Sequence, residues 1–372
     1  MNNNYCIIMA GGIGSRFWPM SRNNYPKQFI DILGTGKSLL QQTYERFTTI
    51  CPVENIYIVT NENYVDYVLT QLPQINLNQV LAEPQRRNTA PCIAYATFKI
   101  KAINPNANMV IAPSDHVIKD EEGFQKAMAQ AFHFAATNDC LLTLGITPNR
   151  PDTGYGYIQY TPLSGGGEAE KGRKGEREKD GLISKVKTFT EKPNLEMAKF
   201  FLKSGEFLWN AGIFVWNMKT IVSAFKTYMP DIYQLFEEGN LLYNSNAEQD
   251  FIRKVYAQCT NISIDYGILE KAKNVYVLSS EFGWSDLGTW RSIYEHLPLD
   301  ANKNAVVANA IMENSSGCIV NVPKERLVVI QGLIDFIVIE SDNVLLICHK
   351  DDEQRVRELV NEVKRKKGEK YI

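Results

Sequence analysis

Histidine and paired cysteine are scarce in this sequence of 372 residues. The four histidines are scattered, and the seven cysteines are far apart, odd in number and without a C-x-x-C pair. Scattered histidines argue against a zinc site. Unpaired cysteines in apolar runs are typical of small buried side chains in a reducing compartment. We therefore expect a cytoplasmic protein in which any metal is a hard ion held by oxygen.

Long apolar runs and an excess of one charge are also lacking. The formal net charge is −2, so no overall basic field exists to gather nucleic acid or anionic lipid. No apolar stretch has the length of a membrane span, and Met1–Ala10 lacks the features of a signal peptide. With 44% hydrophobic and 22% charged residues, the chain has the balance of a globular protein, and its length allows one large domain and a smaller one.

The first half of the chain alternates between strand-like and helical patterns. Such alternation predicts an α/β fold with a doubly wound, mostly parallel sheet. The strand-like segments are Tyr5–Ala10, Asn55–Thr60, Gln79–Ala82, Asn108–Ala112 and Leu141–Leu144, and the helical ones are Tyr64–Leu72, Pro91–Ile103 and Glu121–Ala136.

The pattern changes after Pro151. Tyr155–Tyr160 and Leu182–Thr190 are predicted to be paired strands. Between them, Ser164–Gly181 is rich in glycine and in charges of both signs. Such a segment cannot bury apolar area, so we interpret it as a surface loop, with phosphate binding as the alternative.

A third pattern occupies the end of the chain. Val306–Cys348 is rich in valine and isoleucine, with turn residues at near-regular intervals, and a charged helix follows at Asp351–Lys364. We predict a small, coiled C-terminal β domain, which divides the chain into residues 1–300 and 301–372. We assign this region a structural, oligomerising role in a homodimer.

A glycine-rich turn directly follows the first predicted strand, at Ala10–Arg16. Glycines at this position let backbone N–H groups approach a phosphate. The dinucleotide fingerprint would need glycine at Phe17, and a P-loop at Gly36–Ser38 would need glycine at Asp31. Arg16 and Lys27 supply two cations that suit a triphosphate. An ordinary tight turn is the open alternative.

The stretch from Met9 to Phe29 resembles the signature of the sugar nucleotidyltransferases, specifically the mannose-1-phosphate guanylyltransferases. Seven further motifs follow in the order that this family shows, and together they cover about the first 290 residues. They are Glu83–Pro91, Pro113–His116, Thr153–Ile158, Phe189–Pro193, Trp209–Phe214, Ser263–Tyr266 and Gly283–Gly288.

The resemblance implies a fold of the nucleotide-diphospho-sugar transferase type and the transfer of GMP from GTP to mannose 1-phosphate, releasing pyrophosphate. The attacking phosphate oxygen is already ionised, so catalysis depends on alignment and on charge neutralisation rather than on a strong base. Another hexose or heptose 1-phosphate is an alternative substrate, and a nucleotide-sugar sensor without turnover is an alternative class. A glycosyltransferase would need an Asp-x-Asp metal motif, which this sequence lacks.

Two aspartates are candidate ligands for Mg²⁺ or Mn²⁺. Asp115 follows the predicted strand Asn108–Ala112, at the edge where ligands bind in open α/β sheets, and Asp286 precedes another helix. Two carboxylates and substrate phosphates are typical magnesium ligands, and the resemblance supports this role. An Asx turn at Asp115 and a helix N-cap at Asp286 are the structural alternatives.

The resemblance also assigns the substrate contacts. Arg16 and Lys27 are expected to stabilise the charge of the triphosphate, while Glu83 accepts from guanine N1–H and N2–H. Asn88 contacts the base or caps the helix that begins near Pro91. The full nucleotide-binding set is Gly11, Gly12, Gly14, Ser15, Glu83, Asn88 and Thr89.

The sugar phosphate is expected to meet a second set of residues. Lys192 contacts its phosphate, and Glu191 and Asn210 contact sugar hydroxyls, with Gly156 and Asp265 in the same pocket. The expected catalytic set is therefore Arg16, Lys27, Asp115, Lys192 and Asp286. Many relatives carry an additional isomerase domain with a histidine-rich pocket, which this sequence does not contain, so we predict no isomerase activity.

Overall fold

The computed structural model describes residues 3–162 and 181–372. Its chain forms two compact units that are discontinuous in sequence. The first comprises Met1–Gly11, Thr43–Ser114 and Ile118–Trp284, and the second comprises Gly12–Gln42, Asp115–Val117 and Ser285–Ile372. The predicted surface loop lies outside the described residues, apart from Gly181. The predicted domain boundary at residue 300 stays a prediction. The two compact units divide the chain at other positions.

A nine-stranded sheet forms the centre of the first unit, in the order β3-β2-β1-β4-β9-β6-β10-β8-β7. Its first four strands are parallel, as are β6 and β10, whereas β9 is antiparallel to β4 and β6. The predicted α/β class is confirmed, with a mixed sheet. The bounds are β1 Asn4–Met9, β2 Ile56–Asn61, β3 Val80–Glu83, β4 Asn108–Pro113, β6 Leu141–Ile146, β7 Tyr157–Pro162, β8 Ile183–Thr190, β9 Phe207–Asn217 and β10 Val275–Ser280.

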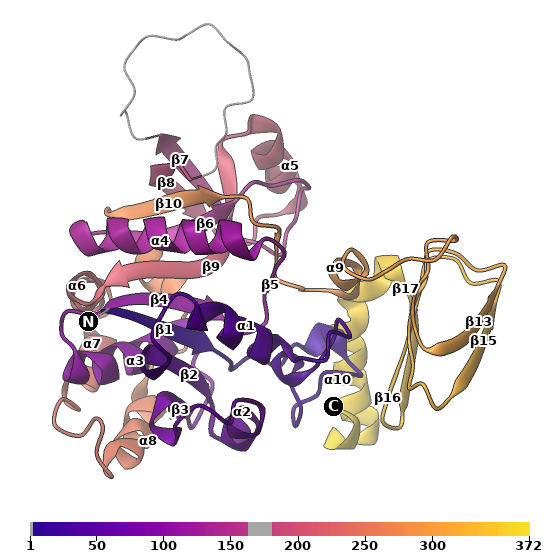
Figure 1. The fold of residues 1–372 in the computed structure, drawn as a ribbon, viewed down its shortest axis with the longest axis horizontal. Coiled ribbons are helices and arrows are strands. Elements are labelled where there is room, and N and C mark those ends of the chain that lie inside the picture. Colours follow the sequence, from indigo (N-terminus) through magenta and orange to yellow (C-terminus); the bar gives the residue numbers. More distant parts are fainter. Residues whose placement is uncertain (1–2, 163–180) are drawn as a thin grey trace, which may run out of the picture. The chain divides into compact units, whose positions relative to one another are not determined.

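Helices cover both faces of this sheet (Figure 1). Every second strand residue, such as Tyr5 and Ile7 of β1, packs in one apolar cluster with helices α3, α6, α7 and α8, as the period of a strand requires. Helix α4 contacts β4, β6, β9 and β10 from outside that cluster. These helices are α3 Thr89–Ile103, α4 Glu121–Thr137, α6 Met218–Tyr228, α7 Pro230–Glu237 and α8 Glu248–Gln258, and the shorter α2 and α5 span Val65–Gln71 and Leu195–Ser204.

Within the described ranges, no helix combines the length and the apolarity that a bilayer span requires.

The C-terminal strands form the small, coiled β structure that was predicted, and most of its pairings are parallel. Strands β12, β14 and β16 pair in parallel, so that Ala305, Ile319 and Ile337 stand in register, and β13 pairs in parallel with β15. Strand β17 closes the larger sheet antiparallel to β16. The elements are α9 Trp290–Tyr294, β12 Ala305–Val307, β13 Asn309–Glu313, β14 Ile319–Asn321, β15 Leu327–Gln331, β16 Phe336–Ser341, β17 Val344–His349 and α10 Val356–Lys367.

The segment 12–42 packs against this coil inside the second unit. Phe17 shares an apolar cluster with Trp290 and Ile337. Trp18 packs with Val356 of α10 and donates its indole N–H to the carbonyl oxygen of Tyr371 at 2.6 Å. The C-terminal region therefore supports the chain that follows the glycine turn, a contribution that its sequence did not reveal.

We expect Trp18→Ala to lower the free energy of unfolding by about 3–5 kcal/mol, because it removes a large buried side chain. Trp18→Phe keeps most of the apolar contact and loses the indole hydrogen bond, so it should cost about 1 kcal/mol. Urea unfolding followed by circular dichroism measures both values. A loss below that of Trp18→Phe for the alanine variant would show that this packing contributes little.

Candidate functional site

A cavity of about 370 Å³ opens beside the glycine turn in the second unit. It brings together six of the residues that the sequence assigned to the phosphates and the metal. Its lining comprises Ile13, Gly14, Ser15, Arg16, Phe17, Lys27, Asp115, His116, Asp286, Gly288 and Arg357.

Lys27 connects the two candidate metal ligands. Its ammonium group donates to Asp115 Oδ2 at 3.0 Å, to the Asp115 carbonyl oxygen at 3.3 Å and to the Asp286 carbonyl oxygen at 2.9 Å. The side chain is only 3% exposed and lies over the ring of Phe17. All three ammonium donors thus have acceptors, and Lys27 neutralises the carboxylate of Asp115 in the lining of the cavity.

Asp115 is ionised at neutral pH. Burial acts to raise the pKa of its carboxyl group, but the charges of Lys27 and His116 and the hydrogen bond from Lys27 outweigh this effect, so the pKa lies below its ordinary value. A carboxylate held in this form presents hard oxygen atoms to the cavity.

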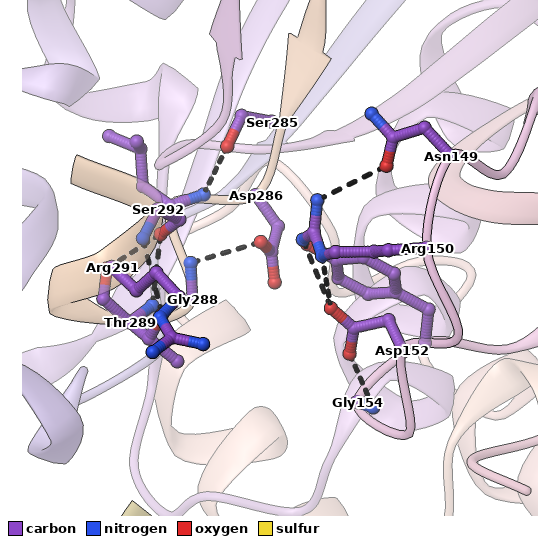
Figure 2. Close-up of polar contacts among 12 residues, drawn as sticks. Asn149, Arg150, Asp152, Gly154, Ser285, Asp286, Gly288, Thr289, Arg291 and Ser292 are labelled. Carbon is purple, nitrogen blue, oxygen red and sulfur yellow. Dashed lines mark hydrogen bonds and ion pairs between the residues drawn. The ribbon is translucent and has the colours of Figure 1, made fainter. Parts of the chain in front are cut away.

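Asp286 closes a tight turn rather than capping a helix (Figure 2). Its Oδ1 accepts from the backbone N–H of Gly288 at 2.9 Å. The N-cap of α9 is Thr289, whose hydroxyl accepts from the N–H of Ser292. The N-cap alternative for Asp286 is therefore wrong, because the helix begins too far along the chain.

Two features of the glycine turn fit a site for an anion. Gly14 has φ of 69°, and a Cβ there would lie 2.6 Å from the Cβ of Lys27, so only glycine fits. Arg16 is half-buried, and within residues 3–162 and 181–372 its buried Nε has no hydrogen-bond partner. A buried N–H of this kind is costly unless a ligand satisfies it.

Glu83 forms a second group, in the first unit. It is buried, its Oε1 accepts from the hydroxyl of Tyr256 at 2.9 Å, and its Oε2 lies 3.3 Å from where a Cβ on Gly11 would stand. Burial raises the pKa of Glu83 to about 7, although the hydrogen bond from Tyr256 and the charge of Arg86 lower it. Sequence reasoning missed Tyr256, because one tyrosine in the apolar pattern of α8 carries no signal.

Asn88 caps helix α3. Its side-chain oxygen accepts from the N–H of Thr89 at 2.9 Å, and its φ is 67°. Thr89 in turn accepts, through its hydroxyl, from the N–H of Ile264 at 2.9 Å. The capping interpretation of Asn88 is confirmed, whereas base contacts of both residues stay predictions.

The five residues assigned to the sugar phosphate gather in the first unit. Asp265 Oδ1 accepts from the amide of Asn210 at 3.0 Å, and Lys192 pairs with Glu191 at 2.7 Å. A Cβ on Gly156 would lie 2.5 Å from Glu191 Oε2, so glycine makes room for that carboxylate. Burial, and then the charge of Glu191, raise the pKa of Asp265 to about 6.

Backbone conformation and hydrogen bonds fix the positions of the residues assigned to the sugar phosphate. Lys192 has φ of 46°, and its N–H donates to the carbonyl oxygen of Tyr155 at 3.2 Å. Asn210 lies inside β9. Its amide oxygen accepts from Thr143 Oγ1 at 3.0 Å and from the N–H of Gly212 at 3.1 Å, which fixes the orientation of the amide.

Comparison with known proteins places the chain in a class. The model of the nucleotidyl transferase family matches residues 5–303, and a model described as a mannose-phosphate isomerase/GMP-like β-helix domain matches residues 308–363. The chain belongs to the nucleotidyl transferase family and is an enzyme of that family.

Individual relatives are more specific. The chain is 34% identical to the mannose-1-phosphate guanylyltransferase of Escherichia coli strain K12, over 97% of this chain and 73% of that protein. A solved structure described as mannose-1-phosphate geranyltransferase from Thermus thermophilus matches 97% of this chain and 99% of that one, with 28% identity and a TM-score of 0.83. These relatives confirm the resemblance found in the sequence.

One further structural neighbour carries a different name. A structure described as mannose-6-phosphate isomerase from Helicobacter pylori covers 76% of this chain and 99% of its own, with 25% identity and a TM-score of 0.59. The isomerase activity in that description belongs to that protein, and the absence of this activity here stays a prediction.

Proposed function

We propose that this enzyme transfers GMP from GTP to mannose 1-phosphate and releases pyrophosphate. The observation that carries the proposal is the cavity beside the glycine turn, where Arg16, Lys27, Asp115 and Asp286 converge. A phosphate oxygen of the sugar phosphate forms a bond to the α-phosphorus as the bond to the bridging oxygen of the β-phosphate breaks. The electron pair leaves with pyrophosphate, and no proton must be removed from the nucleophile.

The chain's own groups orient the reactants and balance charge in this scheme. A phosphate oxygen would accept from the Nε of Arg16, which has no hydrogen-bond partner among the described residues. The buried, positively charged ammonium of Lys27 lies in the lining of the same cavity. Fixed charges of this kind cost no reorganisation during the reaction. Ser15, Gly12 and Gly14 contribute to the phosphate site, and Glu83 with Gly11, Asn88 and Thr89 contributes to the base site.

We also propose that Asp115 and Asp286 hold Mg²⁺ or Mn²⁺. The donor set fits, because two carboxylates line one cavity, and magnesium usually keeps several waters and binds through one or two carboxylates with substrate phosphates. When bound, the ion would neutralise phosphate charge. In the described part of the chain, no group of three or more His, Cys, Asp or Glu side chains is arranged as a complete metal site, so the substrate would have to complete the coordination.

The sugar phosphate is assigned to the cluster of Gly156, Glu191, Lys192, Asn210 and Asp265. This assignment is supported by their hydrogen bonds and ion pair and by a pattern of cation and acceptors that suits a phosphate and sugar hydroxyls.

A panel of triphosphates against sugar 1-phosphates, assayed for pyrophosphate, tests the proposal directly. We expect GTP with mannose 1-phosphate to give the highest kcat/KM. A higher value with another hexose or heptose 1-phosphate would reassign the acceptor. Binding of GDP-mannose without release of pyrophosphate from any pair would favour the sensor.

Lys192→Ala should reduce kcat/KM about tenfold to a few hundredfold, because it removes a charge-assisted contact to the sugar phosphate. The loss should appear on titration of mannose 1-phosphate and not of GTP, while Lys199→Ala, an exposed lysine on α5, should match the wild type. An effect confined to GTP would mean that Lys192 serves the other substrate.

We propose further that the enzyme is a cytoplasmic homodimer. Support for assembly comes from large apolar side chains on the C-terminal strands that are more than half exposed in the single chain, namely Ile311, Leu327, Val329, Leu345 and Ile347. Ile311 and Val329 are neighbours across the β13–β15 pair, and contiguous exposed apolar groups of this kind are typical of protein interfaces.

A further inference from the structure

Helix α10 carries an arginine to the cavity beside the glycine turn. Arg357, in the first turn of this helix, lines the cavity together with Gly14, Ser15 and Arg16. The helix and the cavity-lining part of the turn, residues 13–16, both belong to the second unit. No residue of the C-terminal region was assigned a chemical role from the sequence.

The packing of α10 accounts for this position. Val356, which precedes Arg357, is fully buried and packs with Trp18 and Leu346 in one apolar cluster. Trp18 lies two residues beyond Arg16, and its indole is hydrogen-bonded to the carbonyl oxygen of Tyr371 near the end of the chain. The start of the helix is therefore held against the glycine-turn segment.

Arg357 is exposed, and its charged neighbours differ from those of Arg355 on the same chain segment. Arg355, two residues earlier, pairs with Asp352 and Glu358. By contrast, among the residues that the structure describes, no carboxylate forms an ion pair with Arg357. Burial, and then the positive charge of Arg16, lower the pKa of its guanidinium. Two guanidinium groups that influence each other in this way repel each other.

A bound anion would remove this repulsion and satisfy the buried Nε of Arg16. A guanidinium presents a planar fork of donors that suits phosphate oxygens. Of the phosphates in the proposed reaction, the β- and γ-phosphates of GTP belong beside the glycine turn, because the residues assigned to the sugar phosphate lie in the other unit.

We propose that Arg357 is a catalytic residue that binds the β- and γ-phosphates of GTP and the departing pyrophosphate together with Arg16. The C-terminal helix thereby completes the triphosphate site. This inference rests on the proposed function and adds to it a substrate contact from the β-helix region.

Kinetics in both directions test the proposal with three variants. Arg357→Ala should raise KM for GTP, and KM for pyrophosphate in the reverse reaction, by about ten- to a hundredfold, while KM for mannose 1-phosphate and for GDP-mannose stays unchanged. Arg357→Lys should lie between Arg357→Ala and the wild type, because it keeps the charge and loses the fork. Arg355→Ala, on the same helix, should match the wild type.

Two outcomes would overturn the assignment. One is a folded Arg357→Ala enzyme with wild-type KM for GTP and pyrophosphate. The other is an equal rise in KM for all four substrates in Arg357→Ala that is just as large in Arg357→Lys. A purely structural role of Arg357 would give this result.

A binding measurement separates this inference from the proposed function. Calorimetric titration of inorganic pyrophosphate into the wild type and into Arg357→Lys measures the affinity of the anion site without turnover. Weaker binding to the variant supports the role of Arg357 even if the substrate panel reassigns the acceptor sugar, and equal binding contradicts it.

Discussion

Asp115→Asn and Asp286→Asn should each reduce turnover by at least about a hundredfold, which is the scale expected when a group that stabilises transition-state charge is removed. Both substitutions keep the size of the side chain and remove a negative oxygen donor from the same cavity. Pyrophosphate release measured over a range of Mg²⁺ concentrations gives the activity. Paramagnetic resonance of Mn²⁺ in the presence of GTP reports metal binding without turnover.

The two variants differ in their expected stability. In Asp286→Asn the amide oxygen can still accept from the N–H of Gly288, so the turn should persist. In Asp115→Asn the buried ammonium of Lys27 loses its ion pair, and the free energy of unfolding should fall by about 1–3 kcal/mol. Asp286→Asn is therefore the cleaner test of the metal role.

Asp351→Asn is a matched control, because Asp351 is an exposed carboxylate paired with Arg291. It should leave turnover and Mn²⁺ binding unchanged. Near-normal activity of Asp115→Asn or Asp286→Asn at low Mg²⁺ would remove that residue from the proposed metal site.

Local sequence signals predicted the parts of the site that depend on backbone conformation. The glycine turn is one example, since the positive φ of Gly14 and its contact with Lys27 leave no room for a side chain. The alternation of strands and helices likewise predicted the core of the sheet. The direction of a strand could not be predicted in this way, because the apolar pattern of β9 is the same whether it runs parallel or antiparallel to β4.

Contacts between distant parts of the chain could not be predicted in this way. Tyr256 bonds to Glu83 across 173 residues, and Arg357 reaches the glycine turn from the opposite end of the chain. Neither residue stands in a motif, and each is placed by the packing of its helix. The cap of α9 also needed the structure, because Asp286 and Thr289 are both good N-cap residues.

Glu83 is predicted from the sequence to bind guanine, and the structure adds that its pKa is raised. Its pKa of about 7 lies above its ordinary value because the side chain is buried. The folded protein therefore favours the protonated form of Glu83. The stability that this preference contributes is present below the ordinary pKa of a glutamate, and it is lost as the pH rises from there through about 7. An acceptor for guanine must be ionised, so KM for GTP should rise as the pH falls below about 7.

Glu83→Gln should shrink the preference for GTP over ATP, which we expect to be on the order of ten-thousandfold in the wild type because the site is built around specific hydrogen bonds. The carboxylate would receive both N1–H and N2–H of guanine, whereas adenine would oppose it with the lone pair of N1. Glutamine keeps the size of the side chain and can turn its NH₂ group toward that lone pair. Its kcat/KM for GTP should therefore fall about ten- to a hundredfold, while the value for ATP changes little.

Tyr256→Phe provides a second, independent change at the same carboxylate. The tyrosine hydroxyl donates to Oε1 and lowers the pKa of Glu83, so its loss should move the rise in KM for GTP to higher pH. Glu83→Gln, which has no titrating group there, should lose this pH dependence altogether. Values of kcat/KM for GTP and ATP at saturating mannose 1-phosphate, measured from pH 6 to 9, check both expectations. If the GTP:ATP ratio and its pH profile are the same in all three proteins, guanine is read elsewhere, by the backbone of the Gly11–Gly14 turn or by Asn88.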